Sequence, residues 1–108
     1  MKTKRFVYHL RAAEDALWTE NREVFEGIAA EVAARYRLSA DDVELVTVAI
    51  RERLWEKLVN IAGARQPERV ARTAAYQAAT QAAIALLPDE RRIQLVEQKR
   101  AKRRKRAS

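Results

Sequence analysis

Seven cationic side chains lie close together near the end of the sequence: Lys99, Arg100, Lys102, Arg103, Arg104, Lys105 and Arg106. The protein has a net charge of +7, and the other 15 of its 22 basic side chains balance its 15 acidic ones, so this segment accounts for the whole excess. Lysine and arginine neutralise phosphates and release counterions, which favours a polyanion without reading its sequence. We therefore expect these seven residues to bind the phosphate backbone of DNA or RNA.

The same basic segment has two other interpretations. A solvated, solubilising tail has this composition, and so does a nuclear-localisation signal if the source is eukaryotic. Recruitment to an anionic membrane is less favoured, because no exposed apolar wedge accompanies the charge.

The remaining reactive side chains do not form a catalytic or metal-binding set. His9 is the only histidine, and Ser39 is better explained as a helix cap than as a nucleophile. Two glycines are too few for a phosphate-binding glycine loop. Asp41, Asp42 and Glu44 suit the first turn of a helix, where the dipole favours negative charge. We expect no enzymatic activity, no catalytic residue, no cofactor and no metal site.

Cysteine is absent from the chain, which excludes a disulfide framework and a thiolate metal site and suits a reducing compartment. No apolar run approaches the roughly 20 residues that span a bilayer, and residues 1–10 lack the apolar core of a secretory signal. We expect a cytoplasmic protein that does not enter a membrane.

The clearest predicted element is a helix over residues 40–62. Ser39 is placed to cap it, with Asp42 three positions on as in a capping box, and Gly63 can supply the left-handed residue that often ends a helix. Between these ends an apolar stripe recurs every three or four residues and predicts a buried face. It consists of Val43, Val46, Ile50, Leu54, Leu58 and Ile61.

A second apolar stripe lies on the opposite side of the same helix, at 100° per residue. One neighbouring helix cannot cover both stripes, so the pattern predicts that this helix is sandwiched. Surplus apolar surface here and on the third helix would suit a homodimer or a protein partner. The second stripe comprises Leu45, Val48, Trp55 and Val59.

The preceding residues, 11–37, predict one long helix or two helices that break near Trp18 and Thr19. Only Arg37 and Leu38 separate this segment from the Ser39 cap, which predicts an antiparallel hairpin. Its apolar stripe contains Val24, Phe25, Ile28, Ala29, Val32 and Tyr36.

Two further helices are predicted after the central one. Pro67 suits the first turn of a helix over residues 67–87, whose small side chains allow either close packing or self-association. A helix over residues 88–102 would be anchored on the bundle by Ile93, Leu95 and Val96. The small face of the earlier helix is formed by Ala71, Ala74, Ala75, Ala78, Ala82 and Ala85.

The first ten residues form a predicted amino-terminal arm. Phe6, Tyr8 and Leu10 alternate with Arg5, Val7 and His9 and would fit a short strand, although a helical start or a docked arm fits as well. A strand would need its pair in a second copy, as in the ribbon-helix-helix proteins that bind DNA.

Residues 28–59, IAAEVAARYRLSADDVELVTVAIRERLWEKLV, resemble the opening helix-turn-helix hairpin of the HU/IHF nucleoid proteins. The resemblance covers about a third of the chain and implies a helical hairpin there. Those families continue into a β-sheet and DNA-clasping arms, whereas this chain continues into an alanine-rich helix. We interpret the resemblance as local.

Taken together, the patterns predict an all-α protein: a small antiparallel bundle of about four helices with a basic carboxy-terminal extension. Its expected parts are an arm (1–10), a bundle domain (11–98) and a basic tail (99–108). The expected function is that of a small nucleic-acid-associated accessory protein that binds phosphate without sequence specificity. The alternative is a protein-protein adaptor or inhibitor whose bundle surface binds its partner.

Overall fold

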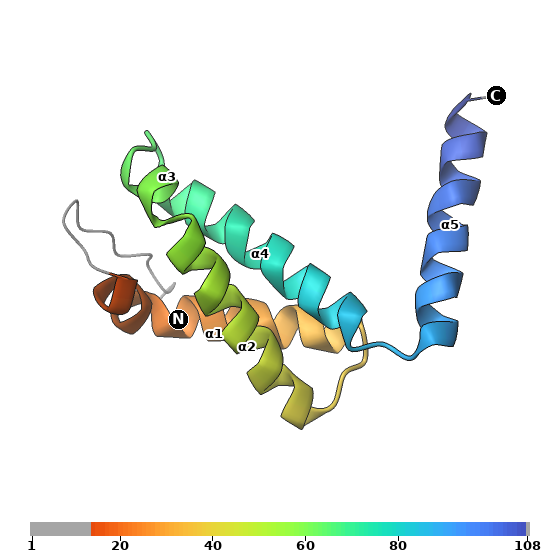
Figure 1. Ribbon diagram of the computed structural model, residues 1–108, viewed down its shortest axis with the longest axis horizontal. Helices are drawn as coiled ribbons and strands as arrows, with labels where there is room; N and C mark the ends of the chain where they lie inside the picture. The colour runs from red at the N-terminus through yellow and green to blue at the C-terminus, as the bar shows by residue number, and fades with distance from the viewer. Residues whose placement is uncertain (1–13, 108) are drawn as a thin grey trace, which may run out of the picture.

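A computed structural model describes the backbone of residues 14–107 and the side chains of residues 17–105. This part of the chain is helical and contains no strand, which confirms the all-α prediction. Its helices are α1 (Glu14–Arg35), α2 (Ala40–Glu56), α3 (Leu58–Ala62), α4 (Pro67–Ala85) and α5 (Asp89–Ala107). In Figure 1, α2 and α4 run side by side, α1 crosses them, and α5 stands apart. The predicted strand or arm at residues 1–10 lies outside the described residues.

The turn between α1 and α2 forms as the hairpin prediction requires, but through an unexpected residue. Arg37 has a positive φ of 56°. Its N–H donates to the Ala34 carbonyl at 3.1 Å and the Leu38 N–H donates to the Ala33 carbonyl at 2.9 Å, the two hydrogen bonds of a Schellman motif. Ser39 then caps α2, because its Oγ accepts from the Asp42 N–H at 3.3 Å. The cap prediction is confirmed.

The predicted single helix over residues 40–62 is broken at Lys57, whose φ of −100° and ψ of 9° leave the helical region. The Lys57 N–H still bonds the Arg53 carbonyl at 3.0 Å, and its own carbonyl accepts from Ile61 at 2.9 Å, so α3 begins at once in a new direction. Gly63 follows with a φ of −88°, so the expectation that it is left-handed is wrong.

A kink in α1 lies at Asn21, where φ is −117° and ψ is 17°, a few residues beyond the break predicted at Trp18 and Thr19. The Asn21 side chain is buried, and its Nδ2 donates to the Leu17 carbonyl at 2.9 Å. A helix kink weakens the backbone hydrogen-bond ladder, and a side chain that inserts there satisfies a carbonyl group. The bend at Asn21 therefore explains why this polar side chain is buried.

The core lies between α1, α2 and α4. Phe25 and Trp18 stack with ring centroids 5.6 Å apart, and α2 contributes Val46, Ile50 and Leu54. From α4 come small side chains, which let its backbone approach both neighbours closely. The buried ones are Ala71, Ala74, Ala75, Ala78, Ala79 and Ala83, whereas the predicted Ala82 is half-buried and Ala85 is exposed.

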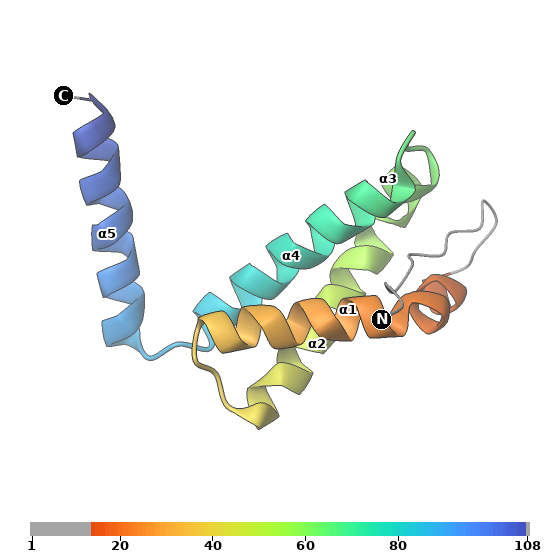
Figure 2. The same ribbon diagram turned by 180° about the vertical axis from the view of Figure 1, so that it is seen from behind.

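Helix α5 differs from its prediction in extent and in position. It continues past residue 102 through the basic segment to Ala107. Of the three side chains predicted to anchor it on the bundle, Ile93 and Val96 are 58% and 50% exposed, and Leu95 is half-buried. Both views show α5 directed away from the other helices (Figures 1 and 2). Arg91 Nη1 donates to the Tyr36 carbonyl at 3.2 Å, which places the start of α5 beside the α1–α2 turn.

Candidate nucleic-acid interface and the open face of α2

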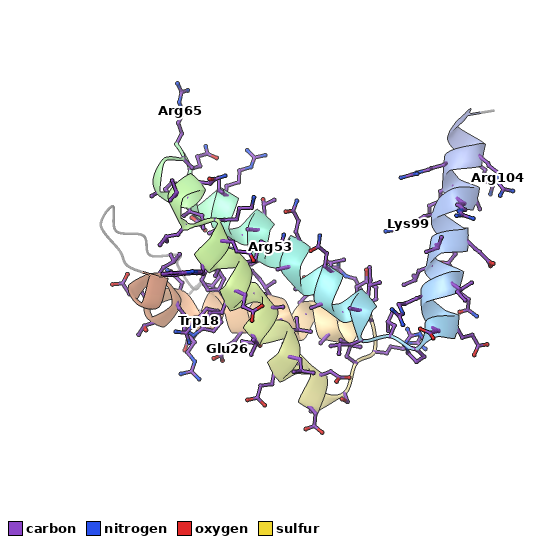
Figure 3. The ribbon with its side chains drawn as sticks, in the orientation of Figure 1. Trp18, Glu26, Arg53, Arg65, Lys99 and Arg104 are labelled. Carbon is purple, nitrogen blue, oxygen red and sulfur yellow. The ribbon has the colours of Figure 1, made fainter. Side chains whose placement is uncertain are left out.

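The basic segment of α5 is exposed along its described length. At 100° per residue its cations are distributed around the whole circumference of the helix, and Figure 3 shows Lys99 and Arg104 directed to different sides. The side chain of Arg106 lies outside the described residues. The predicted binding residues that the structure shows to be exposed are Lys99, Arg100, Lys102, Arg103, Arg104 and Lys105.

This segment is held in a helix in spite of its own charge. Lys99 faces Arg103 and Arg100 faces Arg104 across one turn, and each like-charge pair of this kind costs about 0.2–0.5 kcal/mol. The negative end of the helix dipole offsets part of that cost. An isolated helix of this length is marginal in water. An anionic surface would therefore stabilise the helix by removing the repulsion.

Charge is divided unevenly between α5 and the body of the protein, which consists of α1 to α4. Residues 14–88 contain nine basic and twelve acidic side chains, a net charge of −3. Residues 89–108 contain nine basic and three acidic side chains, a net charge of +6, and residues 1–13 add four basic ones. Residues 14–88 are therefore acidic on balance. The net charge of zero over residues 1–98 does not show this, because that sum includes the four basic side chains of residues 1–13.

The second apolar stripe of α2 is exposed. Leu45, Val48, Trp55 and Val59 are 54%, 50%, 62% and 82% exposed. The first three lie on α2 opposite its buried residues, because α1 and α4 both pack on one side of α2, and Val59 follows on α3 after the break at Lys57. The prediction that this helix is sandwiched is wrong. We call the exposed set, together with the Glu52 that lies within it, the outer stripe.

Carboxylates surround the outer stripe. Asp41 lies on its line at the start of α2, and Glu44 and Glu56 lie along its two edges, all of them exposed. The cations of α2 lie towards the body instead. Arg53, labelled in Figure 3, donates to Gln81 Oε1 of α4 at 2.6 Å and lies 3.6 Å from Glu56. The Arg51 guanidinium lies 5.5 Å from the centre of a Trp18 ring. The open face of α2 is therefore apolar with an acidic border.

Polar contacts also join α1 to α4. Tyr76 donates to Glu31 Oε2 at 2.5 Å. This hydrogen bond to the carboxylate raises the pKa of the Tyr76 phenol, and partial burial and the negative charge of Glu31 act in the same direction. The Tyr76–Glu31 hydrogen bond lies on the exposed side of α1 and α4 and links the two helices.

Within the described residues, no three histidine, cysteine or acidic side chains are arranged to bind a metal ion. No helix in that part of the chain is both long and apolar enough to cross a membrane. His9 lies outside the described residues.

Comparisons with protein-family models, with curated proteins and with solved structures found no match for this chain. Two features were not predicted from the sequence: the continuation of α5 beyond residue 102 to Ala107 and the exposure of the outer stripe. The regular spacing of Leu45, Val48 and Trp55 was visible, but spacing does not show which of two opposite stripes is covered.

Proposed function

We propose that the protein binds nucleic acid through the phosphate backbone, by means of the basic segment of α5. The single observation that supports this is the exposure of six cations around a helix that stands clear of an acidic body. The function is binding and not catalysis. A chain without cysteine suits a reducing compartment, and we place the activity in the cytoplasm.

An α-helix fits the major groove of B-form DNA, which is about 12 Å wide. Cations on every side of such a helix can reach phosphates on both walls of the groove, and contacts of this kind position a protein without reading bases. The deep, narrow major groove of A-form RNA excludes a helix. Duplex DNA of mixed sequence is therefore the expected ligand, and binding should increase the helix content of α5 by neutralising its repulsions.

A salt titration tests the proposal. Filter binding to a mixed-sequence duplex should give a log-log slope approaching about −6, since seven phosphate contacts contribute roughly −0.9 each. Replacing Arg100, Arg103 and Arg104 with glutamine should weaken binding at least about tenfold near 0.1 M salt and reduce the slope by about 3.

The matched control removes three exposed cations from the body. A variant with Lys57, Arg65 and Arg69 changed to glutamine has the same net charge as the α5 variant. It should keep nearly the original slope. Equal losses in the two variants would contradict the proposal, because they would show that total charge and not the α5 helix governs binding.

A second candidate function is that of a protein-protein adaptor or inhibitor, and the exposed outer stripe favours it. Nuclease-treated lysate should then yield a stoichiometric partner with the native chain and none with Trp55→Glu, because the substitution puts a charge in the middle of the apolar surface. Recovery of the same partner with both chains would contradict this function.

A further inference from the structure

Within the described residues, no segment packs over the outer stripe of α2, and its side chains are exposed. Its apolar side chains include Trp55, and four carboxylates accompany them: Glu52 within the stripe, Asp41 at the start of α2, and Glu44 and Glu56 along the two edges. A partner for this surface should be a helix with apolar side chains at one end and cations along the same face.

One face of α5 has this composition. At 100° per residue, Ile93 and Val96 share a face with Arg100, Arg103 and Arg104. Ile93, Val96 and Arg100 line the same shallow hollow on the helix, together with Asp89, Arg92 and Glu97. The two apolar side chains are exposed. The helix therefore leaves an apolar beginning and a cationic continuation uncovered on one side.

The spacing of the two surfaces also agrees. Ile93 and Arg104 are eleven residues apart, and so are Trp55 and Glu44, which corresponds to about 16 Å along each helix axis. In an antiparallel arrangement that sets Ile93 opposite Trp55, Val96 lies opposite Glu52 and Arg100 opposite Val48. Arg103 and Arg104 then lie opposite Leu45 and Glu44, and Arg100 is about one helical turn from both Glu44 and Glu52.

We propose that the outer stripe of α2 binds α5 of a second copy, antiparallel and reciprocally, in a two-fold dimer. The same chain cannot provide this fit without rearrangement. Arg91 bonds the Tyr36 carbonyl at 3.2 Å, so α5 starts beside the beginning of α2, and folding back would put Ile93 near Asp41 and the cations near Trp55. In the reciprocal dimer each copy covers the other once, which closes the assembly.

A dimer formed by two α2 helices has the wrong charge. An antiparallel pair centred on the outer stripe would bring Glu52 against Glu52 of the second copy and gather eight carboxylates, four from each chain. Like charges brought together in this way disfavour association. Charge complementarity thus selects α5 over α2 as the occupant.

The inference does not depend on the proposed function, because it concerns protein contacts alone. Both use Arg100, Arg103 and Arg104, however, so the dimer and duplex DNA should compete for α5. If DNA binding failed and the dimer persisted, only the proposed function would be lost, and the reverse result would remove only the dimer.

A charge-swap experiment on nuclease-treated protein tests the dimer by sedimentation equilibrium. One variant carries Glu44→Arg with Glu52→Arg, and the other carries Arg100→Glu with Arg104→Glu. Each reversal should raise the dimer dissociation constant at least about tenfold, the equivalent of 1.4 kcal/mol. An equimolar mixture should restore the dimer, because both contacts then pair opposite charges.

The matched control is Lys102→Glu with Lys105→Glu, which makes the same change of charge on the far side of α5. It should raise the dissociation constant much less than the Arg100 and Arg104 variant. Far-UV circular dichroism of each variant checks that the body is folded, and the exposed Trp55→Glu provides an independent apolar disruption that should also give monomer.

The proposal is overturned if the native chain stays monomeric at millimolar concentration, or if mixing the two reversed variants does not restore the dimer. It is also overturned if removing residues 1–13 abolishes the dimer while the α5 reversal does not. That result would make the basic amino-terminal segment the occupant of the outer stripe.

Discussion

The two faces of α2 have nearly the same side chains in opposite environments. On the inner face Val46, Ile50 and Leu54 are buried, whereas on the outer face Leu45 and Val48 are about half exposed. The difference arises from α4, whose alanines let α1 and α4 pack closely on a single side of α2. An apolar stripe thus shows that burial of that surface is favourable. Whether a helix of the same copy buries it depends on how the other helices pack.

Helix α5 completes this contrast. It follows α4 and has the length to cover the outer face, yet it is directed away from the body (Figure 1). Its charge of +6 over residues 89–108 makes it a poor component of a dry core and a good ligand for anionic surfaces. The inner face therefore serves stability, and the outer face and α5 are available for association.

A matched pair of leucine substitutions gives the largest expected effect on this contrast. Leu54→Ala should lower the free energy of unfolding by about 2–5 kcal/mol, because it removes a side chain that is 2% exposed and leaves a cavity. Leu45→Ala removes the same atoms from the outer face and should change it by less than about 0.5 kcal/mol. Urea unfolding of dilute protein measures both. Equal costs would show that the outer face is covered within one copy.

Arg37→Gly should stabilise α1 to α4 without changing either face of α2, because Arg37 lies in the turn before that helix. A left-handed residue other than glycine costs about 1–2 kcal/mol, and the greater freedom of unfolded glycine returns about 0.5–1 kcal/mol. The expected net gain in the free energy of unfolding is about 0.5–1 kcal/mol, with an unchanged dimer dissociation constant. Arg35→Gly, two residues earlier and inside α1, should lose about 1 kcal/mol instead.

The smallest effect concerns Tyr76, a polar contact on the solvent side of the helix pair. Tyr76→Phe should lower the free energy of unfolding by less than about 1 kcal/mol at neutral pH, since it removes an exposed hydrogen bond to Glu31. The folded pKa of Tyr76 is raised above its ordinary value of 10.0, so this contribution is complete below pH 10.0 and is lost as the pH rises through the folded pKa. Urea unfolding against pH should show native and variant curves converging at alkaline pH. Curves that stay parallel would contradict the assigned hydrogen bond.

Local chemistry was predictable from the sequence wherever one residue type has one dominant role. Ser39 caps α2 and Pro67 begins α4, as capping and proline preferences require. The inner stripe of α2 was also predictable, because its period of three to four residues continues through Val46, Ile50 and Leu54. These features fix the helices and the α1–α2 hairpin.

The features that were missed depend on competition between residues that sequence alone does not resolve. The left-handed residue is Arg37 at the end of α1 and not Gly63 at the end of α3, because the Schellman hydrogen bonds of the α1–α2 turn impose that conformation on Arg37. Lys57 breaks α2 although neither proline nor glycine is present. The direction of α5 depends on which surface gains more from contact, a balance between charge and burial over the whole molecule.

The two tryptophans of the chain lie in opposite settings, which gives the protein two separate optical reporters. Trp18 is buried against Phe25 with the Arg51 guanidinium beside it, so its emission should respond to unfolding of the body. Trp55 is exposed on α2 and should shift its emission to shorter wavelength only when another surface covers it. Folding and association can therefore be followed in one unlabelled sample.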